Sequence, residues 1–234
     1  MDKLTVLVVD DDKEIVDAIA IYLSSENLNI IKAYDGMQAL EILNTQKVHL
    51  ILLDIMMPKL DGIKATLKIR ESKNIPIILV SAKSEDTDKI IGLNMGADDY
   101  ISKPFNPLEL VARVKSQLRR YVTLGPLERE KEDNAVIVNG GLELDTVQKK
   151  LTVDGEVIKL TPTEFGILEL LMRNPGRVFS IDEIYERVWN EPSFNPENTV
   201  AVHIRRIREK IEINPKDPKY LKVVWGIGYK IEKP

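Results

Sequence analysis

The chain has 234 residues, 44% hydrophobic and 30% charged, so a prior of about 150 residues per domain predicts one or two domains with real cores. The absence of cysteine excludes disulfides, thiolate nucleophiles and cysteine-ligated zinc, and two distant histidines disfavour a histidine metal cluster. The formal charge of −4 argues weakly against nucleic-acid binding. Because there is neither a membrane-length apolar run nor a signal-peptide layout, we expect a cytoplasmic protein without a membrane partner.

The first half alternates short apolar runs with stretches of helical period. The predicted strands and helices are Leu4–Val9, Glu14–Ser24, Asn29–Ala33, Gly36–Asn44, His49–Leu53, Asp61–Arg70, Pro76–Val80, Asp86–Asn94, Ala97–Ile101 and Pro107–Arg120. Five such β–α units predict a doubly wound five-stranded parallel sheet covered on both faces. Continuously apolar runs such as Val6–Val9 are typical of strands buried on both faces.

This pattern stops near Tyr121. The charge run Glu128–Asp133 predicts a solvated linker over residues 122–135, between a first domain at 1–121 and a second at 136–234. The second half has a different order of elements, with four β-like pieces, three helices and a terminal hairpin. They are Ala135–Val138, Leu142–Asp145, Lys150–Val153, Val157–Leu160, Pro162–Arg173, Ser180–Trp189, Glu197–Ile213, Leu221–Trp225 and Tyr229–Ile231.

Polar residues follow four of the five predicted strands in the first half. They are Asp10, Asp11, Asp54, Ser81 and Lys103. Ligands of open parallel sheets bind beyond the carboxyl ends of the strands, so we expect these side chains to converge. Three carboxylates repel one another, which predicts a hard cation such as Mg²⁺. Asp54 is placed to act as a nucleophile toward a phosphoryl group, with Mg²⁺, Lys103 and Ser81 stabilising the transferring oxygens.

A simpler interpretation is that aspartates at strand ends only cap the following helices. We expect that role for Asp12, which precedes the helix starting near Lys13. Five chemically compatible residues, lying beyond the ends of four neighbouring strands, favour one shared site.

The motifs Val9–Asp11, Asp54–Pro58 with Asp61–Gly62, Ser81–Ala82 and Lys103–Phe105 resemble the receiver domain of two-component response regulators. The similarity covers about residues 3–121. It implies a flavodoxin-like fold and transfer of phosphate to Asp54 from a sensor histidine kinase. It also implies that Mg²⁺ is held by the residues Asp10, Asp11, Asp54 and, through its backbone carbonyl, Met56.

The same resemblance implies a switch formed by Ser81 and Tyr100. A phosphoryl group adds oxygens that accept the Ser81 hydroxyl and pair with Lys103. Movement of Ser81 leaves space for Tyr100 to follow, which is a two-state packing element.

Charged residues are dense on the predicted fourth helix, fifth strand and fifth helix. They are Lys89, Asp98, Asp99, Glu109, Arg113 and Arg120. A solvated charged face is one interpretation. The spacing is also similar to that of the OmpR/PhoB-like regulators. That resemblance implies a homodimer, promoted by phosphorylation, with pairs Lys89–Glu109, Asp99–Arg113 and Asp98–Arg120 between protomers.

The last predicted helix combines an apolar stripe with clustered arginines. The stripe is Val200, Ile204, Ile207 and Ile211, and the candidate DNA contacts around it are Thr199, Val202, His203, Arg205, Arg206 and Arg208. Such a helix suits the major groove of double-stranded DNA. The alternative is an ordinary charged surface helix, which Glu209 and Glu212 partly support.

Three segments, Thr199–Val200, Val202–Arg208 and Gly226–Tyr229, resemble the winged helix-turn-helix effector domain of OmpR/PhoB-like regulators. The similarity covers about residues 136–232. It implies that the last helix reads promoter DNA, that the terminal hairpin is a wing at the minor groove, and that Trp189–Glu197 addresses RNA polymerase.

Three positions depart from the usual pattern of these relatives. Ala201 stands where many have an acid, Asn198 where many have a base, and Trp225 where the wing often has an arginine. Since Trp225 cannot supply that charge, we expect Lys222 or Lys230 to contact the sugar–phosphate backbone beside it. With the receiver, this wing is similar to that of the vancomycin-resistance regulators.

The sequence therefore predicts a phosphorylation-dependent transcriptional regulator rather than an enzyme. A phosphohydrolase of the haloacid-dehalogenase type is one alternative, but it needs a second aspartate where Met56 stands. A DNA-binding protein that ignores phosphorylation is another, against which the intact acid cluster argues. We expect binding to need the phosphorylated pair and to fall steeply with salt.

Overall fold

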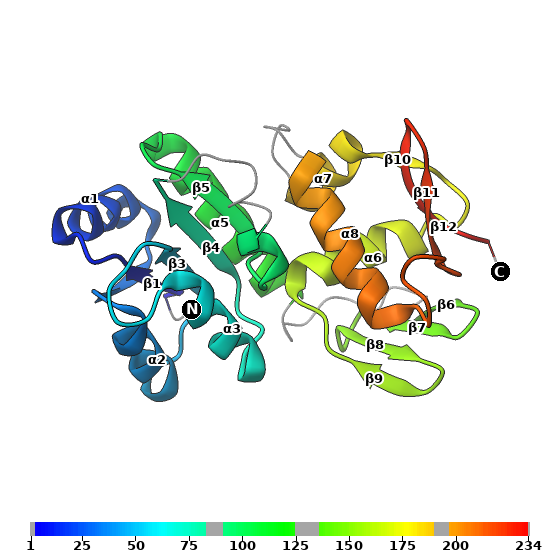
Figure 1. Cartoon of the computed structure of the whole chain (residues 1–234), viewed down its shortest axis with the longest axis horizontal. Coiled ribbons are helices and arrows are strands. Elements are labelled where there is room, and N and C mark those ends of the chain that lie inside the picture. Colours follow the sequence, from blue (N-terminus) through cyan, green and yellow to red (C-terminus); the bar gives the residue numbers. More distant parts are fainter. Residues whose placement is uncertain (1–2, 83–90, 125–135, 190–196, 234) are drawn as a thin grey trace. The chain divides into compact units, whose positions relative to one another are not determined.

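The computed structural model describes residues 3–82, 91–124, 136–189 and 197–233. The chain divides into two compact units, residues 1–121 and 122–234, and a separate apolar core lies in each. Both are drawn in Figure 1.

In the first unit, parallel strands form one sheet in the order β2-β1-β3-β4-β5 (Figure 1). Its strands and helices are β1 (Thr5–Val9), α1 (Lys13–Leu23), the 3-10 turn η1 (Ser24–Glu26), β2 (Asn29–Ala33), α2 (Gly36–Thr45), β3 (Leu50–Asp54), α3 (Gly62–Ser72), β4 (Ile77–Ser81), β5 (Asp99–Ser102) and α5 (Pro107–Leu124). The predicted helix Asp86–Asn94 lies partly outside the described residues, and 91–94 are helical. The predicted doubly wound parallel sheet is confirmed.

The apolar runs of this unit are buried on both faces of the sheet. Every residue of β1, β3 and β4 is buried. Val6 and Val8 face the side chains of α1 and α5, including Ile19 and Val114. Since successive side chains of a strand alternate, Leu7 points to the opposite face. Helices on both faces leave the carboxyl ends of the strands open at one edge.

Where the structure describes the second unit, it contains three helices and two small antiparallel sheets, ordered β6-β7-β8-β9 and β10-β12-β11. Its elements are β6 (Val136–Asn139), β7 (Leu142–Asp145), β8 (Lys150–Val153), β9 (Glu156–Ile158), α6 (Pro162–Met172), β10 (Phe179–Ser180), α7 (Ile181–Trp189), α8 (Glu197–Ile211), β11 (Leu221–Val224) and β12 (Gly228–Ile231). This order fits the predicted winged helix. Strand β10 was not predicted, because two residues carry no periodicity.

Local signals fix several boundaries in the second unit. Asp154 and Gly155 both have positive φ between β8 and β9, as the Asp–Gly pair favours in a two-residue hairpin turn. Thr161 and Glu164 form a reciprocal capping box at the start of α6, with Pro162 in the first turn.

Candidate functional site

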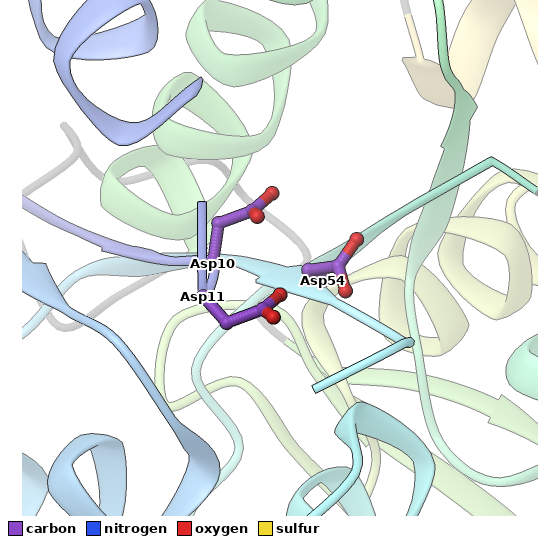
Figure 2. Close-up of side chains that lie close together, drawn as sticks. All are labelled: Asp10, Asp11 and Asp54. Atoms are coloured by element: carbon purple, nitrogen blue, oxygen red, sulfur yellow. The ribbon is translucent and has the colours of Figure 1, made fainter. Parts of the chain in front are cut away.

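Three carboxylates meet at the carboxyl edge of the parallel sheet. Asp10 and Asp11 follow β1, and Asp54 ends the neighbouring strand β3. One oxygen from each lies within 4.8 Å of the others, and Figure 2 shows the side chains gathered in one place. Asp10 and Asp54 are buried, whereas Asp11 is exposed. The expected convergence of these residues is therefore what the topology produces.

Lys103 joins this cluster from the end of β5. Its Nζ donates to Oδ2 of Asp10 at 2.6 Å and to Oδ1 of Asp54 at 2.7 Å. Burial would lower the pKa of Lys103, but its bonds to both carboxylates outweigh that effect and raise the pKa. Burial and the nearby charge of Asp54 raise the pKa of Asp10, although Lys103 opposes them. One ammonium thus compensates two crowded buried carboxylates.

Backbone amides hold the remaining carboxylate oxygens in place. The Asp12 amide donates to Oδ1 of Asp10 at 3.1 Å, and the Met56 amide donates to Oδ2 of Asp54 at 2.6 Å. The loop after Asp54 folds back so closely that a Cβ at position 62 would collide with the Asp54 carbonyl, so this position requires glycine. Asp12 also caps α1 by accepting from the Glu14 amide, which confirms its predicted capping role.

The switch candidates lie on the adjoining strands. Ser81 ends β4 and is fully buried, and its carbonyl accepts from the Lys103 amide at 2.7 Å. Tyr100 lies in β5 and is also buried.

Sequence reasoning missed an ion pair beside the loop that follows Asp54. Lys59 Nζ lies 2.6 Å from Oδ2 of Asp35, the residue that caps α2, and this contact lowers the pKa of Asp35. In the sequence, Asp35 is only an aspartate before a helix start, which predicts a helix cap and says nothing about a lysine partner.

The charged residues assigned to a dimer face have partners within the chain. Arg113 reaches both oxygens of Asp99, at 3.0 and 2.9 Å, and pairs with Glu109 at 2.9 Å. Asp98 pairs with Arg70 of α3 at 2.6 Å. Arg120 donates to Gln117 at 3.1 Å, and Lys89 lies outside the described residues. Asp98 is also fully buried, so pairing with Arg120 of a second protomer requires Asp98 to become accessible.

In the second unit, α8 buries the predicted apolar stripe. Val200, Ile204, Ile207 and Ile211 are all buried in the core of the unit, so this prediction is confirmed. Arg205 is exposed and pairs with Glu209 of the next turn at 2.9 Å. Arg208 donates to the Leu221 carbonyl at 2.9 Å.

The other predicted DNA contacts on α8 are less exposed than residues of a solvated surface helix usually are. Val202, His203 and Arg206 are buried, and Thr199 is half-buried. The His203 ring lies 5.6 Å from the Trp189 ring, centroid to centroid. Arg206 Nε lies 3.2 Å from Oε1 of Glu164, an ion pair whose geometry falls short of a hydrogen bond.

Glu164 is a buried anion that ties α6 to α8. Its Oε2 accepts from the Thr161 amide at 2.9 Å and from Lys210 Nζ at 2.6 Å. Burial alone would raise the pKa of Glu164, but Arg206 and Lys210 hold it below its usual range. The Thr-Pro-Thr-Glu sequence is typical of a capping box, but nothing in the sequence indicated that Glu164 pairs with α8.

A second glutamate, Glu212, ties α8 to the terminal hairpin. Its carboxylate accepts from three successive backbone amides: Lys219 at 2.6 Å, Tyr220 at 2.9 Å and Leu221 at 2.8 Å. The sequence suggested only an exposed acid for this position, so that interpretation is wrong for Glu212. In the hairpin itself, Lys230 pairs with Glu232 at 2.9 Å, Lys222 is half-buried and Trp225 is exposed.

Comparisons with known proteins agree with the two-unit organisation. Residues 6–115 match the family described as response regulator receiver domain, and residues 155–231 match transcriptional regulatory protein, C terminal. Regulatory protein VanR of Enterococcus faecium is 44% identical, over 97% of this chain and 98% of its own length. The alkaline phosphatase synthesis transcriptional regulatory protein PhoP of Bacillus subtilis is 41% identical, over 98% and 97%.

Among solved structures, the response regulator DrrB of Thermotoga maritima, described as an OmpR/PhoB homolog, is similar along the whole chain. It is 32% identical, with a TM-score of 0.51, over 99% of this chain and 100% of DrrB. Within the described part of the chain, no helix is long and apolar enough to cross a membrane.

Proposed function

Because this chain belongs to the OmpR/PhoB family of response regulators, with a receiver and a DNA-binding winged helix, we propose that Asp54 accepts a phosphoryl group from a sensor histidine kinase. Phosphorylation then pairs two receivers through the helix 4–β5–α5 face, and the paired effector units bind promoter DNA and contact RNA polymerase. The segment expected to address the polymerase, Trp189–Glu197, lies mostly outside the described residues.

The observation that carries the proposal is the carboxylate cluster bridged by Lys103. In the transfer, an Asp54 carboxylate oxygen forms the new O–P bond while the P–N bond of the kinase phosphohistidine breaks, leaving an acyl phosphate. Lys103 already lies 2.7 Å from Asp54, so its ammonium can pair with a phosphoryl oxygen on the same carboxylate. The Ser81 hydroxyl, at the end of the neighbouring strand β4, is a further hydrogen-bond donor for a phosphoryl oxygen.

The donor set fits Mg²⁺, because the cluster offers hard oxygen ligands from Asp10, Asp11 and Asp54. The backbone carbonyl of Met56 is the further ligand that the family resemblance implies. When bound, the ion neutralises the carboxylates and the charge that develops on the phosphoryl oxygens. The loop held by the Met56 amide keeps Asp54 oriented toward this site.

Phosphorylation by a small donor tests the proposal without knowledge of the kinase. The full-length chain is incubated with acetyl phosphate and Mg²⁺, and intact mass is followed with and without EDTA. We expect one phosphoryl group on the wild type, none on Asp54→Asn, and none with EDTA. Asp12→Asn is the matched control, because asparagine also caps helices well and Asp12 lies outside the metal cluster.

Equal labelling of Asp54→Asn and the wild type would overturn Asp54 as the acceptor. Labelling at Asp54 that leaves DNA binding unchanged would instead favour an effector that acts independently of its receiver.

A further inference from the structure

The tip of the terminal hairpin presents two large apolar side chains to solvent. Trp225 is 88% exposed and Ile227 is 60% exposed, and they flank Gly226 in the turn between β11 and β12. Such exposure leaves apolar surface in water that burial in a complex would remove.

The turn holds these side chains out from the unit. The Ile227 amide donates to the Val224 carbonyl at 3.0 Å, and Gly226 has a φ of +72°. A Cβ at Gly226 would meet no atom within 4 Å, so the tip stands in open space. At the base, a Cβ at Gly228 would collide with the Phe179 carbonyl, so β12 lies tightly against β10.

The hairpin is also fixed relative to α8. Arg208 donates to the Leu221 carbonyl, and Glu212 accepts the amides that lead into β11. When α8 binds in a groove of DNA, the position of the hairpin tip relative to that groove is therefore determined by these contacts.

The cations of the hairpin are partly neutralised. Lys222 and Lys230 are cross-strand neighbours, and Lys230 pairs with Glu232. The hydrogen bond from Lys230, with a smaller contribution from Lys222, lowers the pKa of Glu232, so this carboxylate stays charged beside both lysines.

We propose that Trp225 and Ile227 form an apolar probe that enters the minor groove beside the α8 site and packs against deoxyribose. The proposal rests on promoter binding by this unit and on the minor-groove position of the wing that the family resemblance implies; what it adds is the role of Trp225 and Ile227. The indole of tryptophan offers a donor and no acceptor, and A·T pairs present the acceptors N3 of adenine and O2 of thymine on the groove floor. In a G·C pair the amino group of guanine obstructs the approach of the indole. The probe therefore favours A·T pairs at the wing position and contributes affinity that salt does not screen.

The test uses full-length protein, with and without acetyl phosphate, and a labelled duplex recovered by selection from a random-sequence pool. Affinity is measured by fluorescence anisotropy over a range of salt concentrations. We expect Trp225→Ala to weaken binding at least about fivefold with the same slope of log Kd against log salt. Trp225→Arg should increase that slope by about one. Ile213→Ala, an exposed apolar residue outside the hairpin, is the matched control and should bind as the wild type does.

Base substitution at the wing position gives a second readout. Changing A·T to G·C should weaken wild-type binding, and inosine·cytosine, which lacks the minor-groove amino group, should restore it. Both effects should vanish in Trp225→Ala. Trp189 is fully buried, so acrylamide quenching of the exposed tryptophan, assigned with Trp225→Phe, should fall when DNA binds.

Three outcomes would overturn the apolar probe. They are wild-type affinity in Trp225→Ala, a flatter salt slope in that variant, and unchanged quenching of Trp225 on a bound duplex. A wild-type chain that selects no DNA would overturn the proposed function itself. Circular dichroism of each variant separates misfolding from lost contact.

Discussion

Lys103 is the residue on which the electrostatics of the receiver pocket depends. It is the cation bonded to both buried carboxylates, and it comes from a strand 49 positions away from Asp54 in the sequence. Without Lys103, the two buried carboxylates of Asp10 and Asp54 would repel each other with little screening by water.

We therefore predict that Lys103→Met lowers the free energy of unfolding by roughly 1–3 kcal/mol at neutral pH, and that Mg²⁺ recovers part of the loss. Urea unfolding followed by circular dichroism, with and without Mg²⁺, measures both effects. Lys64→Met removes an exposed ion pair with Asp61 and should cost about 0–1 kcal/mol. Equal stability of the two variants would contradict this role of Lys103.

Glu164 is the corresponding buried charge in the second unit. Its pKa is depressed, so the stability that it contributes is present above its ordinary pKa of 4.5 and is lost as the pH falls through the lower pKa of the folded state. We predict that Glu164→Gln costs about 2–4 kcal/mol near neutral pH, because Arg206 and Lys210 lose their shared partner.

The difference between Glu164→Gln and the wild type should stay constant above pH 4.5 and shrink below it. Both tryptophans belong to the second unit, so urea unfolding followed by tryptophan fluorescence reports on this unit. A difference that grows toward acid pH would refute the assignment.

At the scale of elements, two glutamates outside the apolar stripe of α8 connect this helix to its neighbours. Glu164 fixes it to α6, and Glu212 fixes the following strand β11 to its end. Side-chain contacts therefore join α8 to both α6 and the terminal hairpin.

We predict that Glu212→Ala lowers the stability of the second unit by about 2–4 kcal/mol, because three backbone amides lose a charged acceptor. Glu209→Ala, one turn earlier and exposed, removes only a surface pair and should cost less than about 1 kcal/mol. Thermal unfolding of both variants measures the contrast, and similar losses would count against the bridging role of Glu212.

At the scale of the whole molecule, charge is distributed unevenly. The net charge is −4, yet residues 203–222 hold seven Lys or Arg against three Asp or Glu. The overall charge thus concealed a local basic segment around the end of α8, while acids elsewhere oppose non-specific attraction to DNA.

We predict that phosphorylation converts the chain from monomer to dimer, and that only the dimer binds promoter DNA tightly at physiological salt. Light scattering with and without acetyl phosphate measures the mass. Asp54→Asn should remain monomeric under both conditions. A monomeric wild type in both states would rule out the dimer and leave the intrachain pairs of Asp98 and Arg113 as purely structural.

The sequence by itself determined the elements and the place where they meet. Continuous apolar runs require strands covered on both faces, and parallel strands carry their carboxyl ends to one edge, so Asp10, Asp11, Asp54 and Lys103 had to approach one another. A repeat of four and three residues likewise determined which side of α8 is buried.

Only the tertiary structure decided which charges pair. Asp98 binds Arg70, 28 residues away, and Glu164 binds Lys210, 46 residues away. Periodicity assigns a side chain to a face of its own element, but the partner depends on how distant elements pack, and a chain with 33 basic and 37 acidic residues offers many combinations. Trp225 was visible in the sequence as a departure from the family pattern, while its exposure at the hairpin tip emerged only from the fold.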